Sequence, residues 1–166
     1  GCSLLTNITI PDAVTSIENF AFSGCNNLDS ISTLEGVTSI GNYAFEECYK
    51  LTNITLGEGI TSLGTGVFKH CKGLTNIPYS YGVTKISDYV YFGCSGLTRI
   101  TIPDAVTSIG EYAFAESMGL TSVTINSGVN EIGYAAFCSC PNLAEVYCKA
   151  TVPPSGQSNM FLVCSD

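Results

Sequence analysis

A leucine recurs every 23 residues along this chain, at Leu5, Leu28, Leu51, Leu74, Leu97, Leu120 and Leu143. The period extends beyond the leucines, because the decapeptide Ile100–Ile109 is identical to Ile8–Ile17, four units upstream. A fixed period of this size indicates a solenoid, in which each unit is one turn that buries its apolar side chains against its neighbours. We therefore number positions 1–23 from each leucine and call each unit a rung.

Five further positions of the rung stay largely apolar, namely 4, 6, 10, 13 and 18. In the rung from Leu97 they are Ile100, Ile102, Val106, Ile109 and Phe114. Positions 4 and 6 alternate with Thr, Ser and Asn, which indicates a strand with one buried face, and positions 10 and 13 indicate a shorter extended segment. Tyr79 and Cys148 also occupy position 6, whereas Thr33 with Leu34 beside it suggests a local shift.

The turns of the rung are predicted from two patterns. We expect Asn42–Glu47 and Glu111–Glu116 to form one or two helical or 3-10 turns. Gly or Asn often closes the rung and is expected to supply a left-handed conformation there. These closing residues are Asn27, Gly73, Gly96, Gly119 and Asn142.

Residues 1–142 are expected to form the repeat array, with a partial rung at 1–4 followed by six repeats that start at Leu5, Leu28, Leu51, Leu74, Leu97 and Leu120. The array is expected to begin inside a longer one. Residues 143–166 form a degenerate last repeat or C-terminal cap. There Val152–Gly156 replaces the second extended segment, its two prolines cannot donate to a strand ladder, and Phe161–Cys164 repeats the rung's ending one residue late.

Composition excludes several classes of protein. The hydrophobic content of 45% with 12% charged residues is too apolar for a disordered chain. Fourteen acidic residues against six basic ones give a net charge of −8, and the basic residues form no stripe that could neutralise phosphates, so we predict no nucleic-acid partner. No apolar run approaches the ~18 residues of a membrane span, so we predict no membrane insertion within this chain.

Seven of the nine cysteines share one column: Cys2, Cys25, Cys48, Cys71, Cys94, Cys140 and, one residue late, Cys164. The rung from Leu97 has Ser117 in this column. Side chains on stacked strands lie farther apart than the ~3.8 Å between Cβ atoms that a disulfide prefers, and the serine indicates a need for a small, weakly polar group. We predict buried thiols that act as core. Cys138 and Cys148 lie off the column, and a local disulfide between them is an open alternative.

Other reactive groups are sparse. His70 precedes Cys71, and a Cys–His nucleophile is conceivable, but we expect a solvated turn histidine beside an inward-facing thiol. Asp12, Glu35, Glu58 and Asp104 share position 8, with Tyr81 and Ser127 interrupting them. This carboxylate column could bind Ca²⁺ or basic partners, and a solvated acidic edge is the default interpretation.

The exposed positions that flank the buried position 4, positions 3 and 5, form the candidate binding face. Thr and Ser there also suit a solvent-facing sheet through hydroxyl pairing, although solenoids use such surfaces to bind partners. Arg99 and Tyr147 are its large irregular groups and its best contact candidates. The candidate residues are Asn7, Thr9, Asn53, Thr55, Asn76, Arg99, Thr101, Ser122, Thr124 and Tyr147.

The pattern Leu-x-x-Ile-x-Ile-Pro-x-x-Val-x-x-Ile-Gly-x-x-Ala-Phe-x-x-Cys, present at Leu97–Ser117 with Ser for Cys, resembles the BspA-like (treponemal-type) leucine-rich repeat. The resemblance implies a leucine-rich-repeat right-handed solenoid of mostly short parallel β-strands, one main and one shorter per rung. It also implies a secreted or surface-anchored protein of host-associated bacteria or parasitic protists. Members are linked with adhesion to host matrix proteins and to other cells, and the family has no catalytic motif to transfer.

Together these observations predict a non-enzymatic extracellular or cell-surface module. It would bind a protein, of the extracellular matrix or a cell surface, or a glycan through the exposed strand face, with no catalytic residue, cofactor or metal. The alternative is a rigid spacer that displays another domain without a ligand of its own. The near-identity of two rungs favours this alternative, since a specific site usually breaks repeat symmetry.

Overall fold

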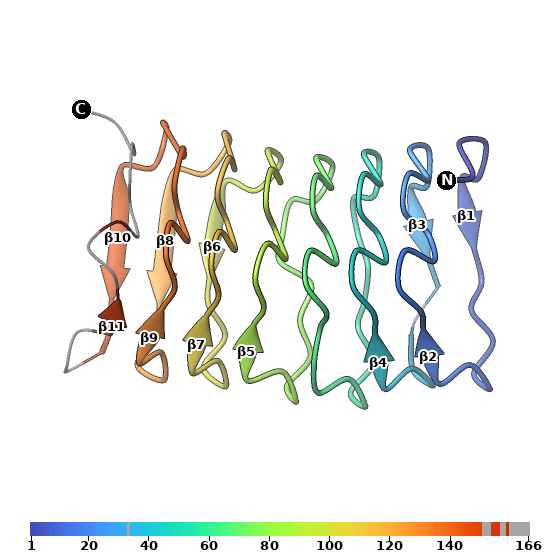
Figure 1. The fold of residues 1–166 in the computed structure, drawn as a ribbon, viewed down its shortest axis with the longest axis horizontal. Helices are drawn as coiled ribbons and strands as arrows, with labels where there is room; N and C mark the ends of the chain where they lie inside the picture. The colour runs from blue at the N-terminus through green and yellow to red at the C-terminus, as the bar shows by residue number, and fades with distance from the viewer. Residues whose placement is uncertain (33, 151–153, 157–158, 160–166) are drawn as a thin grey trace.

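The chain folds as a stack of parallel rungs, a β-solenoid of the predicted kind. The computed structural model describes residues 1–32, 34–150, 154–156 and 159. The rungs lie side by side in sequence order (Figure 1), and every strand pair is parallel. Parallel pairing follows from the repeat itself, because each rung returns the chain to the same side with the same direction.

Positions 3–6 form the main strands on one side of the solenoid. β1 (Asn7–Ile8) pairs with β3 (Ser30–Ile31), and β6 (Arg99–Thr101), β8 (Ser122–Ile125) and β10 (Glu145–Cys148) form a three-stranded sheet. Each strand pairs with its neighbour at the 23-residue repeat distance, as Arg99 does with Ser122. In β10 the predicted core residues Val146 and Cys148 are exposed, because only β8 pairs with this strand among the described residues.

Positions 12 and 13 form the short strands. β2 (Ser16–Ile17) pairs with β4 (Ser39–Ile40), and β5 (Lys85–Ile86), β7 (Ser108–Ile109), β9 (Glu131–Ile132) and β11 (Ser155–Gly156) form a four-stranded sheet. Ser155 pairs with Glu131, one residue beyond the repeat distance. The prediction that Val152–Gly156 replaces this segment is therefore wrong at Ser155 and Gly156, where an inserted residue shifts the strand without removing it from the ladder. Residues 151–153 and 160–166 lie outside the described residues, so the rest of the proposed cap is not placed.

The apolar columns fill the interior as predicted. The position-1 leucines from Leu28 to Leu143 are buried, and Leu5 packs half-buried against them. At position 18 the rings stack continuously from Phe22 to Phe137, with centroids 5.2–5.8 Å apart and interplanar angles of 2–18°. Stacked aromatic rings add specific attraction to the apolar area that they bury.

The cysteine column lies directly beside this stack. Its members at Cys25, Cys48, Cys71, Cys94 and Cys140 are buried. Four of the thiols and the Ser117 hydroxyl donate to the position-18 carbonyl of the preceding rung, at 3.0–3.3 Å. The prediction of a core column is confirmed for these rungs, and the shared carbonyl acceptor explains why serine can replace cysteine.

The segments predicted as helical are instead an arc at positions 15–21, and the described residues contain no helix. Positions 16 and 20 adopt positive φ in all six rungs from Leu5 to Leu120, at 52–71°. Left-handed residues interrupt a helix. The N–H groups at positions 16, 18 and 20 therefore donate hydrogen bonds to carbonyl groups of the next rung. Tyr43 donates to Thr65, Phe45 to Val67 and Glu47 to Lys69, at 2.8–2.9 Å.

The residues that close the rung do not adopt the predicted left-handed conformation. The described residues with positive φ all lie at positions 16 and 20, and none at position 23. Glycine at position 23 serves close packing, since a Cβ at Gly96 would overlap the Lys72 carbonyl of the preceding rung. Where asparagine stands there, its amide bonds that rung instead, as Asn27 Nδ2 does with the Ser3 carbonyl at 2.7 Å.

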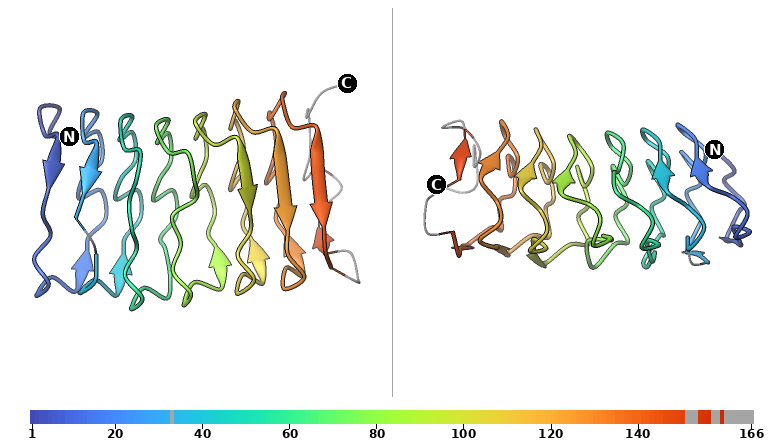
Figure 2. Two further views of the ribbon diagram at one scale, coloured as in Figure 1. Left: turned by 180° about the vertical axis from the view of Figure 1, so that it is seen from behind. Right: turned by 90° about the horizontal axis from the view of Figure 1, so that it is seen from below.

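The main-strand ladder is interrupted in the middle of the stack. In Figure 2, seen from behind, the rungs between β3 and β6 carry no main strand. We call each place where the strand register is lost a register fault. The first register fault is the predicted shift near Thr33, a residue that itself lies outside the described residues. Ser30 pairs with Asn53 at the repeat distance, whereas Leu34 pairs with Leu56 one residue short of it, so the shift is confirmed.

The second fault lies in the rung from Leu74. Pro78 has no N–H to donate, it is buried, and its carbonyl accepts a hydrogen bond from the buried Tyr91 hydroxyl. A one-residue change of register moves each following side chain to the other face. Accordingly Tyr79 is 40% exposed and Ser80 is buried, so the prediction of Tyr79 as core is wrong.

Candidate functional site

The main-strand face displays most of the predicted contact residues. Exposed side chains occur at Asn7, Thr9, Asn53, Thr55, Asn76, Arg99, Thr101 and Tyr147. Pairing of β6, β8 and β10 aligns Arg99, Ser122 and Glu145 in one row and Thr101, Thr124 and Tyr147 in a second. A smaller row of Asn7, Ser30 and Asn53 forms at the other end. The two faults separate these regions, so the face is two patches and not one continuous surface.

Two predicted residues of this face are less accessible than expected. Ser122 is buried, because its short side chain lies between its longer register partners Arg99 and Glu145. Thr124 is half-buried in the row that it shares with Tyr147. The larger patch therefore presents Arg99, Glu145, Thr101 and Tyr147, with Tyr147 54% exposed.

The buried column cysteines Cys48, Cys71 and Cys94 are arranged as neutral core groups. Cys138 and Cys148, which the open alternative paired as a disulfide, are both free thiols. Burial raises the pKa of the Cys48 thiol to about 12 and raises those of Cys71 and Cys94 still more clearly. A nucleophilic cysteine needs a lowered pKa, so these thiols have the opposite environment.

His70 does not activate Cys71. Its ring lies edge-on to Phe92 at 5.3 Å, and its backbone N–H donates to the Phe92 carbonyl. The Cys71 thiol donates to the Phe45 carbonyl at 3.0 Å, inside the core. Within the described ranges, no three His, Cys, Asp or Glu side chains gather as a metal site would require, and no helix could serve as a transmembrane span.

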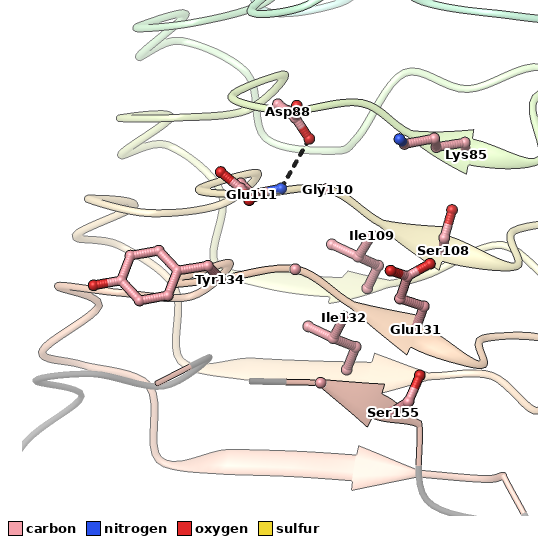
Figure 3. A pocket seen from close by; sticks show the side chains of 12 residues that line it. Lys85, Asp88, Ser108, Ile109, Gly110, Glu111, Glu131, Ile132, Tyr134 and Ser155 are labelled. Atoms are coloured by element: carbon pink, nitrogen blue, oxygen red, sulfur yellow. Dashed lines mark hydrogen bonds between the residues drawn. The ribbon is translucent and has the colours of Figure 1, made fainter. Parts of the chain in front are cut away.

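A shallow groove of about 440 Å³ runs along the short strands β5, β7, β9 and β11 (Figure 3). One wall is the row of register partners Lys85, Ser108, Glu131 and Ser155. On the other side, Asp88 Oδ1 accepts the Glu111 N–H at 2.9 Å, as Asn19 and Asn42 do for their next rungs. Since Asp88 performs this repeating structural role, the groove is a product of the repeat and has no arrangement of its own for chemistry.

A second groove, of about 630 Å³, occupies the site of the two register faults. Its walls come from three successive rungs and include the exposed residues Glu35, Glu58, Tyr79 and Tyr81. Sequence reasoning missed Tyr79 because the periodic numbering assigned it to the core. Two signals could have found this groove, namely Pro78 in a strand position and Tyr81 in a column of carboxylates.

Comparison with known proteins identifies the repeat. The family profile described as "BspA type Leucine rich repeat region" matches residues 1–118 and 84–166, with six copies. No curated protein matches the chain.

Solved structures share the fold. A leucine-rich repeat protein from T. pallidum is 28% identical with a TM-score of 0.79, over 86% of this chain and 69% of its own. A leucine-rich cell surface protein from Faecalibacterium prausnitzii is 29% identical with a TM-score of 0.70, over 87% and 48%. A leucine-rich repeat protein from Eubacterium ventriosum is 27% identical with a TM-score of 0.79, over 95% and 42%. The chain thus spans less than half the length of the last two proteins.

Proposed function

We propose that this chain, which belongs to the BspA-type leucine-rich repeat family, is a non-enzymatic interaction module that binds a protein or glycan outside the cell. The observation that carries the proposal is the pairing of β6, β8 and β10, which aligns Arg99 and Glu145 in one exposed row and Thr101 and Tyr147 in the next. Arginine and tyrosine are frequent among the residues that dominate binding energies. The ladder holds their backbones in place, which lowers the entropy lost on binding.

An extracellular location is part of this proposal. One structural relative is described as a cell surface protein, and it matches 87% of this chain at 29% identity. The acidic balance of the chain, −8 overall, is compatible with that location. Adhesion to a host or to another cell is the role that such a module would serve.

The test is a binding screen of the folded chain against purified extracellular-matrix proteins and an array of glycans. The double variant Arg99→Ala/Tyr147→Ala should weaken binding by at least about 30-fold if both residues are central contacts. The matched control is Lys85→Ala/Tyr134→Ala, which removes one basic and one aromatic residue from the short-strand groove. Equal loss in both variants, or unchanged binding in the first, would contradict the assignment of the main-strand face.

A spacer without a ligand is the second candidate. It is favoured by the identity of Ile8–Ile17 and Ile100–Ile109, since a specific site usually breaks repeat symmetry. If the folded chain binds nothing in the screen while it remains stable as an array, the spacer function replaces the binding function.

A further inference from the structure

The groove at the two register faults, here called the tyrosine groove, breaks the repeat symmetry of the solenoid surface. It is lined by Glu35, Thr55, Leu56, Gly57, Glu58, Gly59, Tyr79, Ser80 and Tyr81. At the same position 6, the rungs from Leu97 and Leu120 have the buried aliphatic residues Ile102 and Ile125. The faults therefore exchange a core residue for an exposed aromatic one and open a hollow next to it.

The two tyrosines form one aromatic wall. Tyr79 and Tyr81 lie edge to face, with ring centroids 5.7 Å apart and planes at 75°, and they are 40% and 76% exposed. Exposed aromatic residues side by side mark a surface suited to a partner. The hydroxyl end of each ring keeps the pair compatible with water when the groove is empty.

The floor of the groove is bare backbone. A Cβ at Gly57 would overlap the Leu34 carbonyl oxygen of the preceding rung. Gly59 is different, since a Cβ there would meet Thr38 and Val37 only at 3.5 Å, an ordinary contact. Glycine at 59 thus leaves open space that packing alone does not require.

The charge of the groove has one sign. Among the described residues that line it, Glu35 and Glu58 carry the carboxylates and none is basic. The Ser80 hydroxyl donates to the Glu58 backbone carbonyl, so it holds the loop and leaves the side-chain carboxylate to solvent. A carboxylate beside an aromatic face is the environment that a guanidinium or ammonium group prefers. The chain makes a contact of this kind itself, with Lys72 Nζ 5.1 Å from the Tyr49 ring centroid.

From these contacts we infer that the tyrosine groove binds an arginine side chain displayed by a protein partner. The planar guanidinium lies against the tyrosine pair and donates hydrogen bonds to Glu58 and Glu35. Arginine suits the groove better than a neutral sugar does, because a guanidinium adds charge attraction to the hydrogen bonds that it donates to the carboxylates, and the net charge of −8 attracts a cationic segment over a distance. The inference rests on the proposed interaction function and assigns it a second surface.

The test is a titration of the folded, ¹⁵N-labelled chain with a short arginine-containing peptide, in which binding is detected by changes in the NMR chemical shifts of the backbone amides. The matched peptide has citrulline, which keeps the shape and removes the charge. The Gly57 amide should shift with the arginine peptide and the Gly128 amide, from the regular rung at Leu120, should not. Raising the salt concentration should weaken binding, because part of the attraction is between charges.

Three groove variants and one control variant check the residues. Tyr81→Ala should weaken binding about 3- to 30-fold, the range from an exposed to a desolvated cation–π contact. Glu58→Gln should weaken binding, whereas Asp12→Asn, in the same column but outside the groove, should not. Gly59→Val should block the groove while the chain keeps its unfolding midpoint, because its Cβ fits without strain.

The inference is overturned if the citrulline peptide binds as tightly, if Gly128 shifts as much as Gly57, or if neutral oligosaccharides shift Gly57 and the arginine peptide does not. These outcomes leave the main-strand proposal standing, since none of these variants touches Arg99 or Tyr147. Conversely, failure of the Arg99→Ala/Tyr147→Ala screen leaves the groove titration unaffected.

Discussion

The arc and the main-strand face of the same solenoid differ in how strictly they repeat. In the arc, positive φ at positions 16 and 20 recurs in all six rungs from Leu5 to Leu120, and the aromatic stack passes through every one of them. On the main-strand face the ladder is lost between β3 and β6, and side chains change from buried to exposed there.

The difference shows which side holds the rungs in register. In the rungs from Leu28 to Leu97, each arc contributes three N–H groups that donate to the next rung, a stacked ring, and a thiol or hydroxyl that donates to the preceding rung, and all of these contacts need a neighbouring rung in register. A fault in one arc would therefore disturb two neighbours. The main strand can lose its ladder in two rungs because the arc still fixes them in register.

The largest expected effect comes from breaking the arc. Phe68→Ala removes a fully buried ring from the middle of the stack and should lower the free energy of unfolding by about 3–5 kcal/mol. Urea denaturation measures it. The control Phe20→Ala removes a 56% exposed ring from the arc of the rung at Leu5 and should cost less than about 1 kcal/mol. Similar losses in both would show that the stack does not dominate.

Alkaline pH should weaken the arc selectively. The pKa of the Cys48 thiol is raised by burial from 9.0 to about 12, so the unfolded chain loses this proton first as the pH rises. The contribution of the protonated thiol to the free energy of unfolding is fully present below pH 9. Between the two pKa values it decreases by up to about 1.4 kcal/mol per pH unit for each such thiol.

The measurement is a set of urea unfolding curves from pH 8 to 11. Cys71→Ser removes one buried thiol, keeps a donor for the Phe45 carbonyl and should flatten the decline. An unchanged slope in this variant would assign the alkaline decline to other groups.

Ser117, in the cysteine column, allows the hydrogen bond to the position-18 carbonyl to be tested separately from the stacking of the position-18 rings. Ser117→Ala loses the bond to the Tyr91 carbonyl in a fully buried site and should cost about 1–2 kcal/mol. Ser117→Cys restores the residue found in the other rungs and should lie within about 0.5 kcal/mol of the parent. If alanine and cysteine behave alike in urea denaturation, the column acts only by its volume.

The smallest effects on stability are expected on the main-strand face. Arg99→Ala and Thr101→Ala should each change the unfolding free energy by less than about 0.5 kcal/mol, because both side chains are exposed. The same variants should be the ones that alter binding. A loss of stability above 1 kcal/mol would mean that this face, too, is structural.

Much of the fold could be predicted because the period supplies the register. Once the leucines are aligned, the columns of Ile, Val, Phe and Cys assign the core, and their burial from Leu28 to Leu143 agrees. The main exceptions are Tyr79 and the exposed residues of β10. There the local backbone, and not the repeat position, determines whether the side chain is buried.

The arc and the binding surface could not be predicted to the same degree. Helical turns were expected from the residues of Asn42–Glu47 and Glu111–Glu116, yet non-glycine residues such as Tyr43 and Glu47 adopt positive φ there. A single chain segment gives no sign of this, because the cost of the left-handed conformation is offset by bonds to the next rung. Ser122 was predicted to be accessible, and only the pairing with Arg99 and Glu145 on either side shows that it is covered.

By itself the sequence determined the period, the apolar columns and the parallel stacking, since these depend on which residue types recur at which spacing. The tertiary structure decided where the ladder breaks, because the shift at Leu34 and the missing N–H at Pro78 act only through neighbouring rungs. It also decided which exposed residues meet. Arg99 and Tyr147 are 48 positions apart in the sequence numbering and share a patch because parallel pairing returns the chain to the same side.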